Sequence, residues 1–222
     1  MTAPVYSLFP GLPPVPARNI FRYLGMGRAE PDPAVAALVE ECMPAFLSAV
    51  RCRACYTVLP VQTDGETVDF GAVQLSSASL AKNLSGCEKA ILFAATLGTQ
   101  VDLQRRQMGV HSPARALVLD AMGSAAIEAL CDQLCESWAE ENPGLRPRPR
   151  FSPGYGDLPL SFQTRLLELL DSKRQAGIAL SQTLLMVPQK SVSAIVGMGP
   201  DGCTMRFHDC GDCDKKDCTF RL

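Results

Sequence analysis

The sequence predicts an α+β fold, in which helices pack on an antiparallel or mixed twisted sheet as one domain. Two observations support this prediction. Apolar residues recur at helical spacing in some segments and form short continuous runs in others, so the 222 residues contain both helices and strands. Their order is helix, hairpin, helix, strand, helix, helix, hairpin, which does not alternate as a parallel α/β chain would.

Composition divides the chain into three parts. The N-terminal arm (1–30) has five prolines between residues 4 and 16, which fix φ and remove backbone donors. We therefore expect residues 4 to 17 of the arm to be extended and to wrap over the body. The body (31–200) carries the predicted core, and a cysteine-rich C-terminal tail (201–222) follows it.

The sequence of the first half of the body predicts two helices, a strand hairpin and a central strand. Apolar spacing favours a helix over 35–50, kinked at Pro44. The runs "ACYTVLPVQ" and "ETVDFGAVQL" are typical of a strand hairpin around Asp64 and Gly65. A short helix in "SSASLAKNLSG" should end at Gly86, and the continuous apolar run "KAILFAATLG" suits a central strand.

The second half is organised around one long helix. Ser112 is a good N-cap and Pro113 a good first helical residue, so a helix should run from there to Trp138 as the spine of the fold. A further helix, "SFQTRLLELLDSKRQAG", should end at Gly177. The runs "SVSAIVGM" and "CTMRFH" predict two strands joined by a turn at 200–202.

Composition also excludes classes of partner. The net charge is −2 and 20% of the residues are charged, so no basic excess is present to bind a phosphate backbone, and we expect no nucleic acid partner. The N-terminus lacks a basic region followed by an apolar block, and no segment approaches the roughly 20 apolar residues that span a bilayer. We therefore expect a cytoplasmic protein with no membrane partner.

The tail contains cysteines at the spacing of a metal site. Cys210, Cys213 and Cys218 form a C-x2-C-x4-C array, with Cys203 or His208 near enough to supply a fourth ligand. Thiolates suit both zinc and an iron–sulfur cluster, so the spacing does not choose between them. The alternative is a set of reduced cysteines in a solvated tail.

The other cysteine pairs are better explained as buried thiols. Cys52 and Cys55 form a C-x2-C pair, but it precedes a strand rather than opening a helix as a redox dithiol does. Cys131 and Cys135 lie four residues apart on the long helix, where small buried apolar residues are expected.

Two further features carry little functional weight. The segment "GMGPDG" (197–202) matches the dinucleotide-binding pattern, but strand residues follow it where that pattern needs a helix N-terminus, so we reject the match. His111 stands before a helix without a companion catalytic residue.

The stretch "RFSPGYGDLPL" (150–160) is the strongest candidate for a binding site. Arg150 is a planar donor suited to a carboxylate. Pro153-Gly154-Tyr155-Gly156 allows close approach of backbone to a ligand, with one aromatic ring beside it. The alternative is a surface turn whose tyrosine only packs.

Residues 150–155 resemble the R-x-x-x-G-Y motif of the S-adenosylmethionine-binding activation domain of cobalamin-dependent methionine synthase. The following "GIALSQTLLMVPQKSVSAIVG" is similar to the Gly, Met, Pro and Ser-Val-Ser succession of that domain. The resemblance is strongest over 150–197 and weaker over 112–140, and it is closest to the stand-alone form of the domain.

The resemblance implies a reactivation subunit that positions S-adenosylmethionine and supplies no chemistry of its own. Cobalamin would be carried by the partner, a methionine synthase or another corrinoid protein, and a flavodoxin or ferredoxin would reduce its inactive cob(II) state. Methyl transfer from the sulfonium would then restore the active cofactor. The alternatives are an iron–sulfur electron-transfer protein and a non-catalytic adaptor for a corrinoid methyltransferase.

The resemblance also implies roles for individual residues. Arg150 would bind the carboxylate of the ligand. The loop from Pro153 to Gly156 would hold the ligand, with Gly154 and Tyr155 lining the methyl-donating face. The family places a glutamate on the long helix near the ligand's ammonium group; Ser124 aligns with it, and Glu128, one turn on, is the nearest acidic residue.

Overall fold

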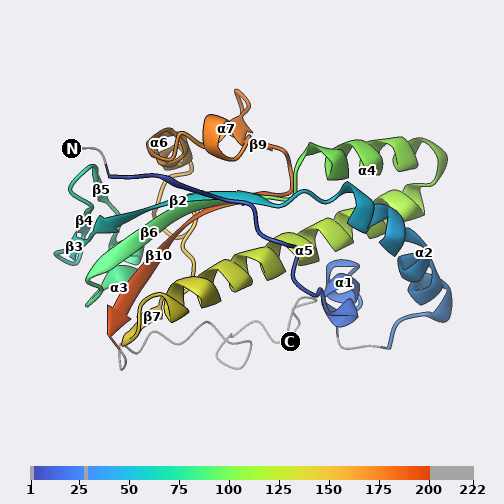
Figure 1. Ribbon diagram of the computed structural model, residues 1–222, viewed down its shortest axis with the longest axis horizontal. Coiled ribbons are helices and arrows are strands. Elements are labelled where there is room, and N and C mark those ends of the chain that lie inside the picture. The colour runs from blue at the N-terminus through green and yellow to red at the C-terminus, as the bar shows by residue number, and fades with distance from the viewer. Residues whose placement is uncertain (1–2, 28–29, 201–222) are drawn as a thin grey trace.

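The computed structural model describes residues 3–27 and 30–200. Its centre is a five-stranded sheet in which every neighbouring pair is antiparallel (Figure 1). Across the sheet, the strands are β1 (Tyr6–Leu8), β2 (Arg53–Pro60), β6 (Lys89–Thr96), β10 (Ser191–Pro200) and β7 (Leu145–Pro147). The predicted α+β class is confirmed, and the sheet is of the antiparallel kind.

β6 is the middle strand because its side chains are apolar on both faces. Ile91 and Phe93 point into one core, whereas Leu92 and Ala94 point into the other, and all four are at most 1% exposed. A strand buried on both sides is expected to be continuously apolar. The prediction of a central strand in this run is therefore confirmed.

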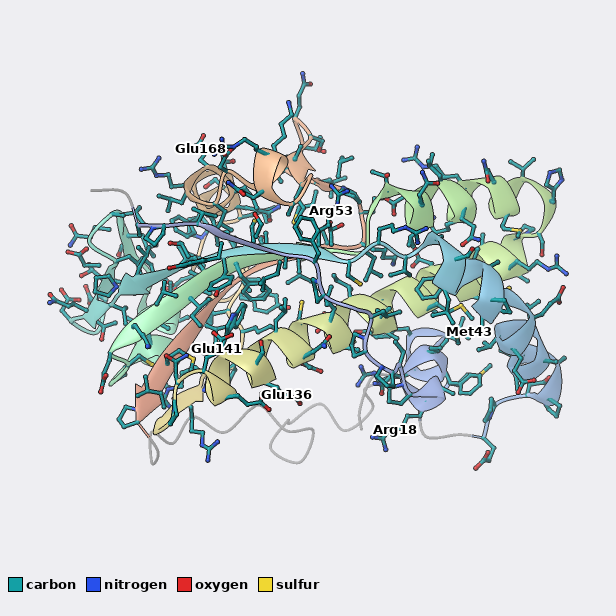
Figure 2. All side chains as sticks on the ribbon, in the orientation of Figure 1. Arg18, Met43, Arg53, Glu136, Glu141 and Glu168 are labelled. Atoms are coloured by element: carbon teal, nitrogen blue, oxygen red, sulfur yellow. The ribbon has the colours of Figure 1, made fainter. Side chains whose placement is uncertain are left out.

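Helices cover both faces of the sheet. The first core lies under four helices: α1 (Ala17–Tyr23), α2 (Pro33–Ala49), α4 (Thr99–His111) and α5 (Pro113–Glu140). The second lies under α3 (Ala78–Leu84), α6 (Phe162–Leu169) and α7 (Ser172–Gln175). Glu136 accordingly lies on α5 on one side of the sheet, and Glu168 on α6 on the other (Figure 2).

α5 is the spine that the sequence predicts. Ser112 caps it, since its hydroxyl oxygen accepts a hydrogen bond from the backbone N–H of Arg115 at 3.3 Å, and Pro113 is its first residue. Near its other end, the buried Trp138 packs against the rings of Phe93 and Tyr56, with centroids 5.2 and 5.3 Å away. The helix is thus fixed along the length of the sheet.

Two predictions about elements need correction, the hairpin around Asp64 and the helix that was expected to end at Gly177. The hairpin expected around Asp64 does not include β2, which pairs with β1 and β6 instead. The turn there joins two short strands of a separate sheet, and the Asp64 carboxylate accepts from the backbone N–H of Thr67 at 2.7 Å. That sheet consists of β3 (Gln62–Thr63), β4 (Thr67–Asp69) and β5 (Gln74–Ser76).

The helix expected to end at Gly177 is interrupted, because Asp171 adopts a left-handed conformation with φ of 45° between α6 and α7. A small hairpin of β8 (Ala179–Leu180) and β9 (Met186–Val187) follows. Two helices, α1 and α4, were not predicted. The predicted strand "CTMRFH" lies outside the described residues.

The described ranges contain no helix whose length and apolar character would allow it to cross a membrane.

Candidate functional site

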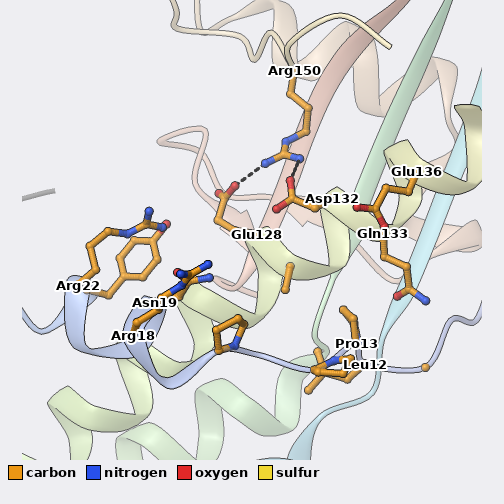
Figure 3. A pocket seen from close by; sticks show the side chains of 15 residues that line it. Leu12, Pro13, Arg18, Asn19, Arg22, Glu128, Asp132, Gln133, Glu136 and Arg150 are labelled. Carbon is orange, nitrogen blue, oxygen red and sulfur yellow. Dashed lines mark hydrogen bonds and ion pairs between the residues drawn. The ribbon is translucent and has the colours of Figure 1, made fainter. Parts of the chain in front are cut away.

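Arg150 lies between two carboxylates of α5. Its Nη2 is 2.6 Å from Oε2 of Glu128 and its Nη1 is 2.5 Å from Oδ1 of Asp132 (Figure 3). The two acids are four residues apart, so they face the same way on the helix, one turn above the other. One guanidinium therefore bridges two like charges and offsets part of their mutual repulsion.

The backbone around Arg150 is held by the edge of the sheet. After β7, the chain continues along β10: the N–H of Arg148 donates to the carbonyl of Gly197 at 2.7 Å, and Phe151 and Ile195 exchange two hydrogen bonds of 2.9 Å. Arg150 stands between these two anchors. Its side chain is aimed at α5 by the sheet and not by a loose surface loop.

The surroundings of Arg150 keep it charged. Burial opposes the charge, but the hydrogen bond to Asp132, with the negative charges around it, raises the pKa of Arg150 above the ordinary value. Its side chain is 21% exposed, so it retains access to a ligand. Burial also raises the pKa of the neighbouring thiols of Cys131 and Cys135, although the charge of Arg150 acts in the opposite direction.

A cavity of about 760 Å³ opens beside this cluster. One wall is α5, with Glu128 and Asp132; the other walls are α1 and the proline-rich arm, including Tyr23 and Leu12 (Figure 3). Burial raises the pKa of Tyr23, and the charge of Glu128 raises this pKa further. The carboxylate of Glu128 therefore interacts electrostatically with Tyr23 on α1 as well as with Arg150.

A second cavity, of about 520 Å³, lies on the other side of the cluster. It is bounded by the C-terminal half of α5 and by the segment from Arg146 to Arg150. Asp132, Glu136 and Arg150 line both cavities. The ion pair between Arg150 and Asp132 therefore lies at the boundary between the two cavities.

Ser124, which aligned with the acidic position of the family, does not contact Arg150. Its hydroxyl donates to the carbonyl of Asp120 at 3.1 Å and accepts from Nζ of Lys190 at 2.9 Å. Lys190 also pairs with Asp120 at 3.1 Å. Ser124 thus joins α5 to the chain entering β10, and Glu128, one turn on, is the residue that meets Arg150.

The loop from Pro153 to Gly156 lies outside both cavities. Tyr155 is 60% exposed, and its ring contacts Phe151 edge-on, with centroids 6.2 Å apart. Pro153 is buried, and Gly154 has φ of 94°, which favours glycine. Gly154 is four residues from Arg150, so their Cα atoms are at most about 14 Å apart. An extended ligand held by Arg150 has to leave the cavity to reach this loop.

Asp157 has a structural role that the sequence did not reveal. Its carboxylate accepts from the Ser77 hydroxyl at 2.5 Å and from the backbone N–H groups of Ala78 and Ser79 at 2.7 and 3.1 Å. The hydrogen bond from Ser77, with those from Ser79 and Ala78, lowers the pKa of Asp157 to about 2. The loop is thereby fastened to the beginning of α3.

The predicted metal ligands cannot be placed. Cys203, Cys210, Cys213 and Cys218 lie outside the described residues. Within the ranges that are described, no group of three or more histidine, cysteine or acidic side chains could hold a metal ion. Burial raises the pKa of Cys52 to about 11 and that of Cys55 to about 12, so both are neutral thiols, as the sequence suggested.

Residues 197–200 are strand residues of β10. The residues that follow the dinucleotide-like pattern lie outside the described part of the chain, so its rejection stays a prediction. The position of Gly197 leaves no room for a side chain, because an added Cβ would be 2.7 Å from Cδ2 of Leu84, at the end of α3, and 2.7 Å from Sγ of Cys87.

Residues 143–219, which carry Arg150 and the loop, match the family model for "Vitamin B12 dependent methionine synthase, activation domain". This chain resembles that activation domain. The resemblance inferred from the R-x-x-x-G-Y motif is thus confirmed. No curated protein matches the sequence.

A solved structure extends the comparison to the fold. The crystal structure of the MetH reactivation domain bound to AdoHcy aligns with a TM-score of 0.63 over 92% of this chain and 81% of that one, at 16% sequence identity. At this identity the likeness shows the fold, which is that of an activation domain.

Proposed function

We propose that this chain is a stand-alone reactivation subunit that binds S-adenosylmethionine and presents it to cobalamin carried by a partner methionine synthase. The observation that supports this most is the placement of Arg150 against Glu128 beside a large cavity, within the segment that matches the activation-domain family. The AdoHcy bound in the solved MetH reactivation domain is consistent with a ligand of this class.

The cluster can recognise the amino-acid end of such a ligand. A guanidinium presents parallel donors that match a carboxylate, and a carboxylate accepts hydrogen bonds from an ammonium group. Arg150 would therefore bind the ligand carboxylate and Glu128 its ammonium group. Both protein groups are partly buried, which strengthens their attraction for the ligand compared with groups in open water.

The loop would hold the other end of the ligand. We assign Pro153, Gly154 and Gly156 to the backbone that approaches the nucleoside, and Tyr155 to the face where the methyl group leaves. The exposed ring of Tyr155 is accessible to a partner. The partner's cobalamin would accept the methyl group, after a one-electron reduction by a flavodoxin or ferredoxin, and S-adenosylhomocysteine would be the product that remains. This chain contributes orientation.

Substitution of Arg150 tests the proposal. Arg150→Ala removes a partly buried charged hydrogen-bond partner of the ligand, so we expect binding of S-adenosylmethionine to weaken by roughly 2 to 4 kcal/mol, measured by isothermal titration calorimetry. Arg165→Ala is the matched control, because it removes the same charge from α6 on the opposite side of the sheet. The proposal is wrong if the wild-type protein binds neither S-adenosylmethionine nor S-adenosylhomocysteine.

A further inference from the structure

Two protein carboxylates already bind the end of the Arg150 guanidinium, one at each Nη atom. Nη1 donates to Asp132 and Nη2 to Glu128. A carboxylate that binds a guanidinium in the favoured bidentate manner requires two adjacent parallel N–H groups. A ligand carboxylate that binds across Nη1 and Nη2 therefore competes with the two protein carboxylates, and one of them has to move to admit it.

The two acids differ in how easily they can leave. The side chain of Asp132 is 63% exposed and that of Glu128 is 40% exposed. A well-exposed carboxylate regains hydration when its ion pair breaks, and such pairs contribute little net stability. Glu128 is more enclosed and faces α1 across the larger cavity, where it can hold an ammonium group. Asp132 is thus the acid whose ion pair with Arg150 is easier to break.

The position of Asp132 supports the same choice. It lines both cavities, together with Arg150 and Glu136, so its movement exposes the guanidinium toward both. We propose that Asp132 is an internal competitor for Arg150: its carboxylate holds the guanidinium in the ligand-free protein and is displaced by the carboxylate of the ligand. This inference rests on the proposed function, because it assumes a ligand that carries a carboxylate.

The test is the substitution Asp132→Asn, with S-adenosylhomocysteine as the probe in calorimetry. Removing the competing charge should tighten binding about two- to fivefold, the range that corresponds to loss of an exposed ion pair. Binding of 5′-methylthioadenosine, which has the nucleoside but no carboxylate, should change by less than about twofold. Unchanged or weaker binding of S-adenosylhomocysteine would overturn the inference.

Glu136→Gln is the matched control. Glu136 lines the same two cavities and carries the same charge, but it makes no hydrogen bond or ion pair with Arg150 in the part of the chain that the structure describes. If Glu136→Gln tightens binding as much as Asp132→Asn, the effect is a general one of charge and the competitor role is wrong. If the wild-type protein binds neither probe, the proposed function itself fails, which is a separate result.

Discussion

At the residue scale, Asp157 shows how the loop beside the site is fixed. One carboxylate accepts from three donors at the beginning of α3, so the residue after Gly156 cannot move freely. Gly156 itself fits tightly, since an added Cβ would be 2.6 Å from Oγ of Ser79. The loop that we assign to the nucleoside is therefore preorganised by a contact with a helix on the other face of the sheet.

We expect Asp157→Ala to lower the Tm by about 2 to 4 °C at pH 7, as for the loss of a helix cap. The pKa of Asp157 is about 2 in the folded protein, below the ordinary value near 4. Its stabilising effect is therefore complete above about pH 4 and is lost as the pH falls toward 2. Thermal unfolding of both proteins across this range should show their difference in Tm shrinking; a constant difference would contradict the role of the charge.

Two of the residues that the sequence singled out, Arg150 and Glu128, form an ion pair, whereas the aligned Ser124 bonds to Lys190 instead. Arg150 and its loop were recognisable because their residue types and spacing are local. The sequence named Glu128 only as the nearest acidic residue to Ser124, because both occupy the same face of α5 and only the position of the crossing segment decides between them. That position is set by the backbone pairing of Phe151 with Ile195, which joins residues far apart in the chain.

At the element scale, the packing of α3 on β10 depends on a missing side chain. An added Cβ at Gly197 would be 2.7 Å from atoms of Leu84 and Cys87, and 3.1 Å from Cγ of Arg148. Gly197→Ala should therefore overpack this contact and destabilise the fold by about 1 to 3 kcal/mol, measured by urea unfolding. Gly11→Ala is the control, because no heavy atom lies within 4 Å of its added Cβ; equal effects of the two substitutions would refute the packing argument.

Elements were predictable where the local signal was strong. α5 and β6 have a cap, a helical period or a continuous apolar run. α4 is polar over most of its length, and the residue before it is Gly98, with φ of 88° and no side chain to cap the helix. Neither a cap nor an apolar face therefore indicates this helix in the sequence. The break between α6 and α7 at Asp171 was unpredictable for a related reason. Asp171 is a non-glycine residue with positive φ, and the pattern of apolar residues does not indicate such a conformation.

At the scale of the whole molecule, the larger cavity is assembled from distant parts. Leu12 and Tyr23 come from the N-terminal arm and α1, Glu128 from α5, and Arg150 from the sheet edge. The arm was expected to wrap over the body, and β1 does pair with β2. The cavity itself could not be predicted, because its volume depends on how the arm, α1 and α5 meet and not on any one of their sequences.

The metal site predicted in the C-terminal tail also concerns the whole molecule, because the described part of the chain contains no other group of side chains that could hold a metal ion. The buried thiols of Cys52 and Cys55 have raised pKa values and are poor ligands in their neutral form. A metal should therefore depend on the tail cysteines. We expect anaerobically purified protein to contain zinc or an iron–sulfur cluster, measured by metal analysis and absorption, and Cys213→Ser to lose it. Cys52→Ala should retain it; a metal-free wild-type protein, or loss in both variants, would contradict a tail site.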